Sequence, residues 1–216
     1  MNYSLILSDT TRSLKYLKEI YSSGFIVESV FLYSLNNSSK LLKYCRSKRI
    51  KFINLKSNSI NSKYSKNKIL SSKYKNFIFS GVPGEIVNED LLIKKNLYHC
   101  HPGKLPQFKG STILYYSLLL KKKICCSIIK LKKKIDVGNV FFEKYHLPPK
   151  NRYTLENFYD DGIRAKTILS FVKKKNTSKI KKNGLKKFPH YYICHPLIRA
   201  IVIQKNKINY VFKSKR

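Results

Sequence analysis

The stretch 97–103, Leu97-Tyr98-His99-Cys100-His101-Pro102-Gly103, has the pattern of a buried β-strand that ends in a sharp turn. Side chains at positions i and i+2 of a strand lie on the same face. His99 and His101 are therefore predicted to point together. Pro102 lacks the hydrogen-bond donor of a strand, and Gly103 lets the backbone turn. Because α/β folds bind ligands at the carboxyl ends of their strands, the two histidines mark a candidate site.

Strand and helix patterns alternate on both sides of this stretch. The predicted strands are short apolar runs at 2–8, 25–33, 52–55, 76–80, 97–101, 124–131 and 140–145. Segments with apolar residues at helical spacing lie between or after them, at 9–21, 39–48, 85–95, 111–122 and 154–173. Residues 57–75 are either a weakly amphipathic helix or a solvated connection. This alternation predicts an α/β fold, a mostly parallel sheet with helices on both faces.

Length and composition fit one domain with a small appendage. We predict a domain at 1–150 and a C-terminal helix with a basic extension at 151–216. No run approaches the roughly 18 consecutive apolar residues of a membrane span. The first ten residues have no basic region before an apolar stretch, so no secretory signal is predicted. Five cysteines without paired metal-ligand spacing favour free thiols in a reducing cytoplasm.

The formal net charge of +34 invites a nucleic-acid interpretation. Only seven of the 45 basic residues are arginine, the side chain that nucleic-acid readers favour for bidentate contacts. The lysines are spread along the chain and are densest at 173–187. The composition of an AT-rich genome accounts for this pattern, and a selected anionic partner is the alternative. Such a charge would attract RNA or acidic lipid non-specifically at low salt.

Three segments together resemble the folate-dependent formyltransferases. They are the stretch His99 to Gly110, with its string His101-Pro102-Gly103-Lys104-Leu105-Pro106, the loop Ile135-Asp136-Val137-Gly138-Asn139-Val140, and Phe77 to Ile86. The likeness follows the family's order and spacing over residues 1–150. Either motif alone would be weak, whereas the joined pair is specific. The resemblance implies a Rossmann-like domain, in agreement with the alternation of strands and helices.

The resemblance also implies a reaction, in which the formyl group of 10-formyltetrahydrofolate passes to an amine. His101 would stabilise the oxyanion or move the proton, and Asp136 would orient and charge-pair its imidazole. The folate site would be lined by main chain at Gly103, Lys104, Leu105 and Pro106. A second loop would cradle the pterin ring, at Gly81, Pro83, Gly84 and Ile86.

His99 departs from the family pattern, which has asparagine there. An asparagine offers a neutral amide donor to the formyl oxygen, and a neutral histidine also offers one N–H, but with a different reach. Losing one oxyanion donor typically lowers turnover by about 10²–10³-fold. His99 is therefore a working substitute, a sign of another acyl chemistry, or the mark of a catalytically silent relative.

Structural alternatives accompany each candidate residue. A histidine beside an apolar strand commonly bonds a main-chain carbonyl, and Asp136 alone would suit a turn. Two histidines with a carboxylate also resemble a metal site, although that pattern belongs to all-β barrels; we predict no metal. Packing or loop roles are expected for His190 and His195. A solvated face with i,i+4 pairing is expected for Asp160, Asp161 and Arg164, with acceptor binding as the alternative.

The acceptor follows from elimination among the family's substrates. After residue 149 too few residues remain for the C-terminal barrel of methionyl-tRNA formyltransferases. The segment 8–12 lacks the glycine-rich phosphate loop of the glycinamide ribonucleotide enzymes. An amino sugar, often nucleotide-linked, remains among known acceptors, and water would make the protein a hydrolase. The alternatives are a catalytically silent ligand- or RNA-binding homologue and, less favoured, a methionyl-tRNA formyltransferase.

Overall fold

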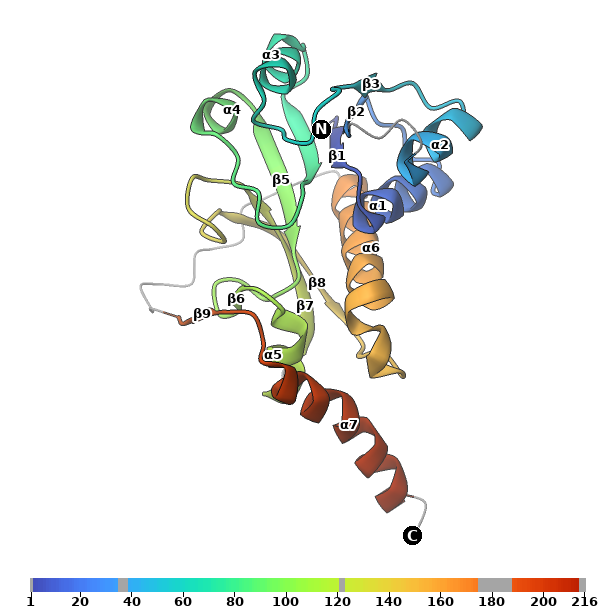
Figure 1. The fold of residues 1–216 in the computed structure, drawn as a ribbon, viewed down its shortest axis with the longest axis vertical. Coiled ribbons are helices and arrows are strands. Elements are labelled where there is room, and N and C mark those ends of the chain that lie inside the picture. The colour runs from blue at the N-terminus through green and yellow to red at the C-terminus, as the bar shows by residue number, and fades with distance from the viewer. Residues whose placement is uncertain (1, 35–38, 121–122, 175–187, 214–216) are drawn as a thin grey trace.

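A seven-stranded sheet forms the centre of the molecule (Figure 1). The computed structural model describes residues 2–34, 39–120, 123–174 and 188–213. The strand order is β3-β2-β1-β4-β5-β7-β8. The strands β3, β2, β1, β4 and β5 run parallel, and β7 and β8 are antiparallel additions at one edge. Their bounds are β1 Ser4–Ser8, β2 Val30–Tyr33, β3 Ile53–Asn54, β4 Asn76–Ser80, β5 Asn96–His101, β7 Ile124–Lys130 and β8 Val140–His146.

Helices cover both faces of this sheet, as the sequence predicted. In β1, Leu5 and Leu7 belong to one apolar cluster and Ile6 to the other, which is the period-two alternation of a strand buried on both faces. The first cluster includes α1 (Thr11–Ser22), α2 (Lys40–Ser47) and α6 (Asp160–Lys173), and the second includes α3 (Lys63–Ser71) and α4 (Glu89–Lys94). The predicted α/β class with a mostly parallel sheet is confirmed.

Residues after 150 supply one of these covering helices. Figure 1 shows α6 running beside α1 on one side of the sheet. Phe171 of α6 lies with its ring centroid 5.4 Å from those of Tyr3 and Tyr98. The division at residue 150 stays a prediction. The C-terminal helix α7 (Pro196–Lys213) follows a two-stranded ribbon of β6 (Lys109–Gly110) and β9 (His190–Tyr191), and it contacts α5 (Ile113–Leu119).

Some predicted elements differ in their bounds. The helix predicted at 85–95 begins only at Glu89, because 81–88 form a loop. The helix predicted at 154–173 starts as a 3-10 turn (Arg152–Thr154) and a π-helical turn (Leu155–Tyr159). The Asn151 side chain caps the 3-10 turn by accepting from the Tyr153 N–H. The nine residues between β7 and β8 are too short for a parallel crossover, so these strands form a hairpin.

Residues 175–187 of the basic run at 173–187 lie outside the described residues. In the part of the chain that the structure describes, no helix combines the length and apolar character needed to cross a membrane.

Candidate functional site

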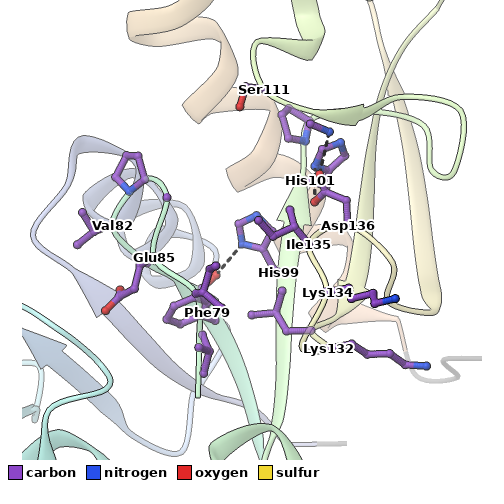
Figure 2. Close-up of a pocket in the computed structure, with 18 of the residues that line it drawn as sticks. Phe79, Val82, Glu85, His99, His101, Ser111, Lys132, Lys134, Ile135 and Asp136 are labelled. Carbon is purple, nitrogen blue, oxygen red and sulfur yellow. Dashed lines mark hydrogen bonds and ion pairs between the residues drawn. The ribbon is translucent and has the colours of Figure 1, made fainter. Parts of the chain in front are cut away.

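A cavity of about 370 Å³ lies at the carboxyl ends of β4 and β5, and Arg12 of α1, the helix that follows β1, joins its wall. The chain order reverses between β1 and β4, so this is the crevice where doubly wound sheets bind ligands. Its walls come from the loop 81–87, from His99 and His101 on β5, and from the β7–β8 loop. Figure 2 shows His99 between Val82 and Glu85 on one side and Ile135 and Asp136 on the other.

His101 and Asp136 form a buried pair at one end of this cavity. Their Nδ1 and Oδ1 atoms lie 3.2 Å apart, and their side chains are 3% and 9% exposed. His101 Nε2 lies 2.7 Å from the carbonyl oxygen of Phe108. Asp136 Oδ2 accepts a hydrogen bond from the Gly110 N–H at 2.8 Å. Burial acts to raise the pKa of Asp136, but the hydrogen bonds and charge of His101 and the Gly110 N–H outweigh it and lower that pKa.

Two glycines make this close arrangement possible. A Cβ atom at Gly103 would lie 2.7 Å from the Phe108 carbonyl oxygen and 3.0 Å from His101 Nε2. A Cβ atom at Gly110, which has a φ of +107°, would lie 1.9 Å from the Tyr191 carbonyl oxygen. Gly103 therefore lets the main chain approach His101 closely, and Gly110 lets β6 approach Tyr191 of β9.

We expect Gly103→Ala to destabilise the protein by about 1–3 kcal/mol, because the added methyl group meets main-chain atoms that cannot move independently. Chemical unfolding measures the change. Gly162→Ala is the matched control, since a Cβ atom there would meet nothing within 4 Å. On α6 that control is expected to add about 0.5–1 kcal/mol of stability. Equal stability of the two variants would contradict the steric interpretation.

His99 is the second histidine of the cavity wall and is only partly buried. Its Nδ1 lies 3.4 Å from the carbonyl oxygen of Phe79. Burial, with the guanidinium charges of Arg164 and Arg12 next in importance, lowers the pKa of His99 from 6.5 to about 3. His99 is therefore a neutral imidazole at neutral pH.

This low pKa predicts a change in acid stability. Below about pH 6.5 the unfolded chain takes up a proton at His99 that the folded chain refuses until the pH nears 3, so stability falls as the pH falls through that window. His99→Asn removes this contribution. Its melting temperature is expected to fall less steeply with acid than that of the wild type, in scans at matched pH values. Parallel curves would contradict the assignment.

The loop Gly81–Ile86 is held by the carboxylate of Glu85. Glu85 Oε2 accepts from the Tyr33 hydroxyl at 2.7 Å, and Oε1 accepts from the Ser59 hydroxyl at 2.7 Å and the Ile60 N–H at 2.9 Å. The Tyr33 hydroxyl also accepts from the Val82 N–H at 3.2 Å. The predicted pterin-loop residues Gly81, Pro83, Gly84 and Ile86 all line the cavity. Main-chain groups at this wall are thus held in place before any ligand arrives.

The other predicted folate segment lies elsewhere. Gly103, Lys104, Leu105 and Pro106 do not line the cavity. The Ser127 hydroxyl on β7 donates to the Gly103 carbonyl at 2.7 Å and accepts from the Leu105 N–H at 3.1 Å. Lys104 lies 5.9 Å from the ring centroid of Tyr145. The segment thus supports the turn after His101.

The cavity is also lined by several cationic side chains that were not among the site residues predicted from the sequence. Arg12 donates to the Ser80 hydroxyl and the Gly81 carbonyl, and Arg164 donates to Asp160 at 2.8 Å and the Cys100 carbonyl at 3.3 Å. The i,i+4 pairing of Arg164 is confirmed, but the expected solvated face is wrong, since Arg164 is 8% exposed. It is buried because α6 packs over the sheet. The remaining cationic or titratable lining residues are Lys132, Lys133, Lys134 and His190.

His190 and His195 have different surroundings. β9 pairs with β6, and this brings His190 to the cavity wall beside Gly110. His195 Nδ1 accepts from the Leu197 N–H at the start of α7, which is a local loop role. Within 2–34, 39–120, 123–174 and 188–213, no three His, Cys, Asp or Glu side chains are grouped so as to hold a metal ion.

Comparison with solved structures identifies the architecture. A sugar N-formyltransferase from Shewanella superposes with a TM-score of 0.60 at 16% identity, covering 95% of this chain and 88% of that one. A phosphoribosylglycinamide formyltransferase from Bacillus halodurans gives 0.57 at 14% identity, with 82% and 97% covered. The chain has the formyltransferase fold. An N-formyltransferase from Helicobacter canadensis in complex with folinic acid and dTDP-3-aminofucose gives 0.56 at 18% identity, with 89% and 71% covered. No protein-family model and no curated protein sequence matches the chain.

Proposed function

We propose that this protein transfers a formyl group from 10-formyltetrahydrofolate to the amine of a small-molecule acceptor. The supporting observation is that His99, His101 and Asp136 meet the loop Gly81–Ile86 in one cavity of the formyltransferase fold. A cytoplasmic location is part of the same proposal.

The cavity suits the pterin ring of the donor. Its volume of about 370 Å³ lies in the range of small-molecule sites. Apolar side chains form part of the wall, with Phe79 and Leu131 from strand ends and Ile135 from the β7–β8 loop. Flat aromatic rings gain from such surfaces. The loop Gly81–Ile86, anchored by the hydrogen bonds of Glu85 and Val82, adds main-chain donors and acceptors for the polar edge of the ring.

The proposed reaction needs few groups from the protein. The acceptor nitrogen forms a bond to the formyl carbon, the bond from that carbon to donor N10 breaks, and the proton lost by the amine ends on N10. The chain's tasks are to orient the amine, to offset charge on the formyl oxygen and to exclude water. The Asp136 carboxylate fixes the orientation of the His101 ring beside this reaction.

A nucleotide-linked amino sugar is the acceptor that we propose. The complex of the Helicobacter canadensis protein with dTDP-3-aminofucose supports this choice by analogy. The cavity wall carries the cations Arg12, Arg164 and lysines 132–134 and the carboxylates of Glu85 and Asp136. Arg164 pairs with Asp160 and Lys133 with Glu89, so the excess of positive charge is small. An excess of positive charge favours a phosphorylated acceptor over a neutral one.

Incubation with 10-formyltetrahydrofolate and a panel of amines tests the proposal. We expect tetrahydrofolate release together with a formylated product from a dTDP-amino sugar, detected by mass spectrometry. Release of tetrahydrofolate and formate without a formylated product would show a hydrolase instead. If no acceptor, water included, gave turnover, transfer activity would be refuted.

A folate-binding protein without turnover is the second candidate. It is favoured by one observation: both ring nitrogens of His101 already face protein oxygens. Binding of folinic acid in the absence of any turnover would support this candidate over the first.

A further inference from the structure

The two histidines of β5 differ in what their ring nitrogens are free to do. His101 Nε2 faces the carbonyl oxygen of Phe108, which can only accept, and Nδ1 faces the Asp136 carboxylate. The lowered pKa of Asp136 keeps that carboxylate ionised at neutral pH. His101 therefore directs both nitrogens at protein atoms, and its side chain is 3% exposed.

His99 has a different arrangement. The carbonyl oxygen of Phe79 can only accept, so the contact at 3.4 Å places the proton of His99 on Nδ1. Because a neutral imidazole carries only one N–H, Nε2 is then unprotonated and keeps its lone pair. Figure 2 shows this ring between the loop of Val82 and Glu85 and the loop of Ile135. The ring lines the cavity and is only partly buried, so a ligand can reach it.

We propose that His99 is the histidine that contacts the reacting groups, and that it does so as a hydrogen-bond acceptor through Nε2. This inference rests on the proposed formyl transfer. The group that meets His99 must then donate a hydrogen bond, and the N–H of the acceptor amine can do so. Accepting that hydrogen bond aims the lone pair of the amine nitrogen at the formyl carbon.

The surrounding charges favour this role. Arg164 and Arg12 line the same cavity as His99, and so do His101 of β5 and Asp136 of the β7–β8 loop. The two guanidiniums disfavour a positive charge on His99. A neutral ring keeps its lone pair for hydrogen bonding. It thus differs from the asparagine of the family pattern, whose carboxamide also carries N–H donors. Any charge on the formyl oxygen must be met by another donor of the wall.

Nitrogen-15 NMR of histidine side chains tests the tautomer directly, without any acceptor. Assignment uses the loss of one ring signal in His99→Asn and of another in His101→Asn. We expect the His99 ring of the free protein to be protonated at Nδ1 and unprotonated at Nε2. A protonated Nε2 would overturn the inference whether or not the protein is a formyltransferase.

The same spectra followed while a dTDP-amino sugar is added to the complex with folinic acid test the contact. We expect the His99 Nε2 resonance to move further than either nitrogen of His101. A change confined to His101 would overturn the proposed contact. If folinic acid does not bind at all, the proposed donor fails, whereas the tautomer result still stands by itself.

Turnover of His99→Phe supplies the functional readout. Phenylalanine keeps the ring shape but cannot accept a hydrogen bond, so kcat should fall by about 10²-fold while the affinity for folinic acid changes little. His195→Phe, which changes a histidine outside the cavity, is the matched control and should keep wild-type turnover. Unchanged kcat in His99→Phe would contradict a contact with the reacting groups.

Discussion

Asp136→Asn is expected to lower formyl-transfer turnover by about 10²-fold, because the carboxylate holds His101 and the β7–β8 loop in place beside the reacting groups and a small misplacement there costs about that much. The asparagine side chain can still accept from the Gly110 N–H, so the loop keeps one of its two anchors. It cannot supply the negative charge that faces His101 Nδ1 at 3.2 Å. The loss should therefore appear in kcat, with little change in the affinity for folinic acid. Steady-state kinetics and calorimetry measure the two quantities separately.

Asp161→Asn is the matched control for this variant. Asp161 lies outside the cavity and accepts a hydrogen bond from the Thr11 hydroxyl at 2.8 Å. We expect it to keep wild-type turnover. If Asp136→Asn were as active as Asp161→Asn, the pair of Asp136 with His101 would have no part in the reaction.

Arg164→Met is expected to cause the largest loss of stability. Burial opposes the charge of Arg164, but Asp160 and its other neighbours raise the Arg164 pKa, so the guanidinium stays charged. Removing one partner of a buried ion pair costs about 3–5 kcal/mol. The lower end applies because Asp160 is 21% exposed. For a domain of this size, that loss lowers the melting temperature by roughly 6–12 °C.

A control and a second readout accompany this variant. Lys166→Met changes an exposed cation on the same helix and should leave the melting temperature nearly unchanged. The charge of Arg164 also lowers the pKa of His99, so Arg164→Met should raise that pKa in an NMR titration. A melting temperature equal to that of Lys166→Met would show that the ion pair does not stabilise the fold.

Local patterns were sufficient to predict most of the fold. A short apolar run such as Leu5-Ile6-Leu7 indicates a strand that is buried on both faces of a sheet. In the structure Leu5 and Leu7 belong to one apolar cluster and Ile6 to the other. The helix predicted at 9–21 corresponds to α1, whose start is capped by the Thr10 side chain, which accepts from the Ser13 N–H. His101 and Asp136 lie 35 positions apart in the sequence, and the joint motif indicated that they belong together.

What the sequence could not show depends on tertiary packing. Arg164 has the i,i+4 pattern of a surface helix, and only the position of α6 over the sheet buries it. No sequence motif pointed to Arg12. It lies at the cavity because its guanidinium donates hydrogen bonds to the Ser80 hydroxyl and the Gly81 carbonyl at the end of β4. His190 reaches the cavity through pairing of β9 with β6, more than 75 residues apart. Such pairings leave no local pattern.

Calorimetric titration with folinic acid tests the central claim most directly. The proteins compared are the wild type, Ile86→Arg and Ile93→Arg; both isoleucines are exposed, but only Ile86 lines the cavity. Because the two variants add the same charge, non-specific attraction of the ligand is matched between them. We predict that the wild type and Ile93→Arg bind folinic acid equally and that Ile86→Arg loses most of the affinity. Absence of binding to the wild type, or equal binding by Ile86→Arg, would contradict a folate site in this cavity.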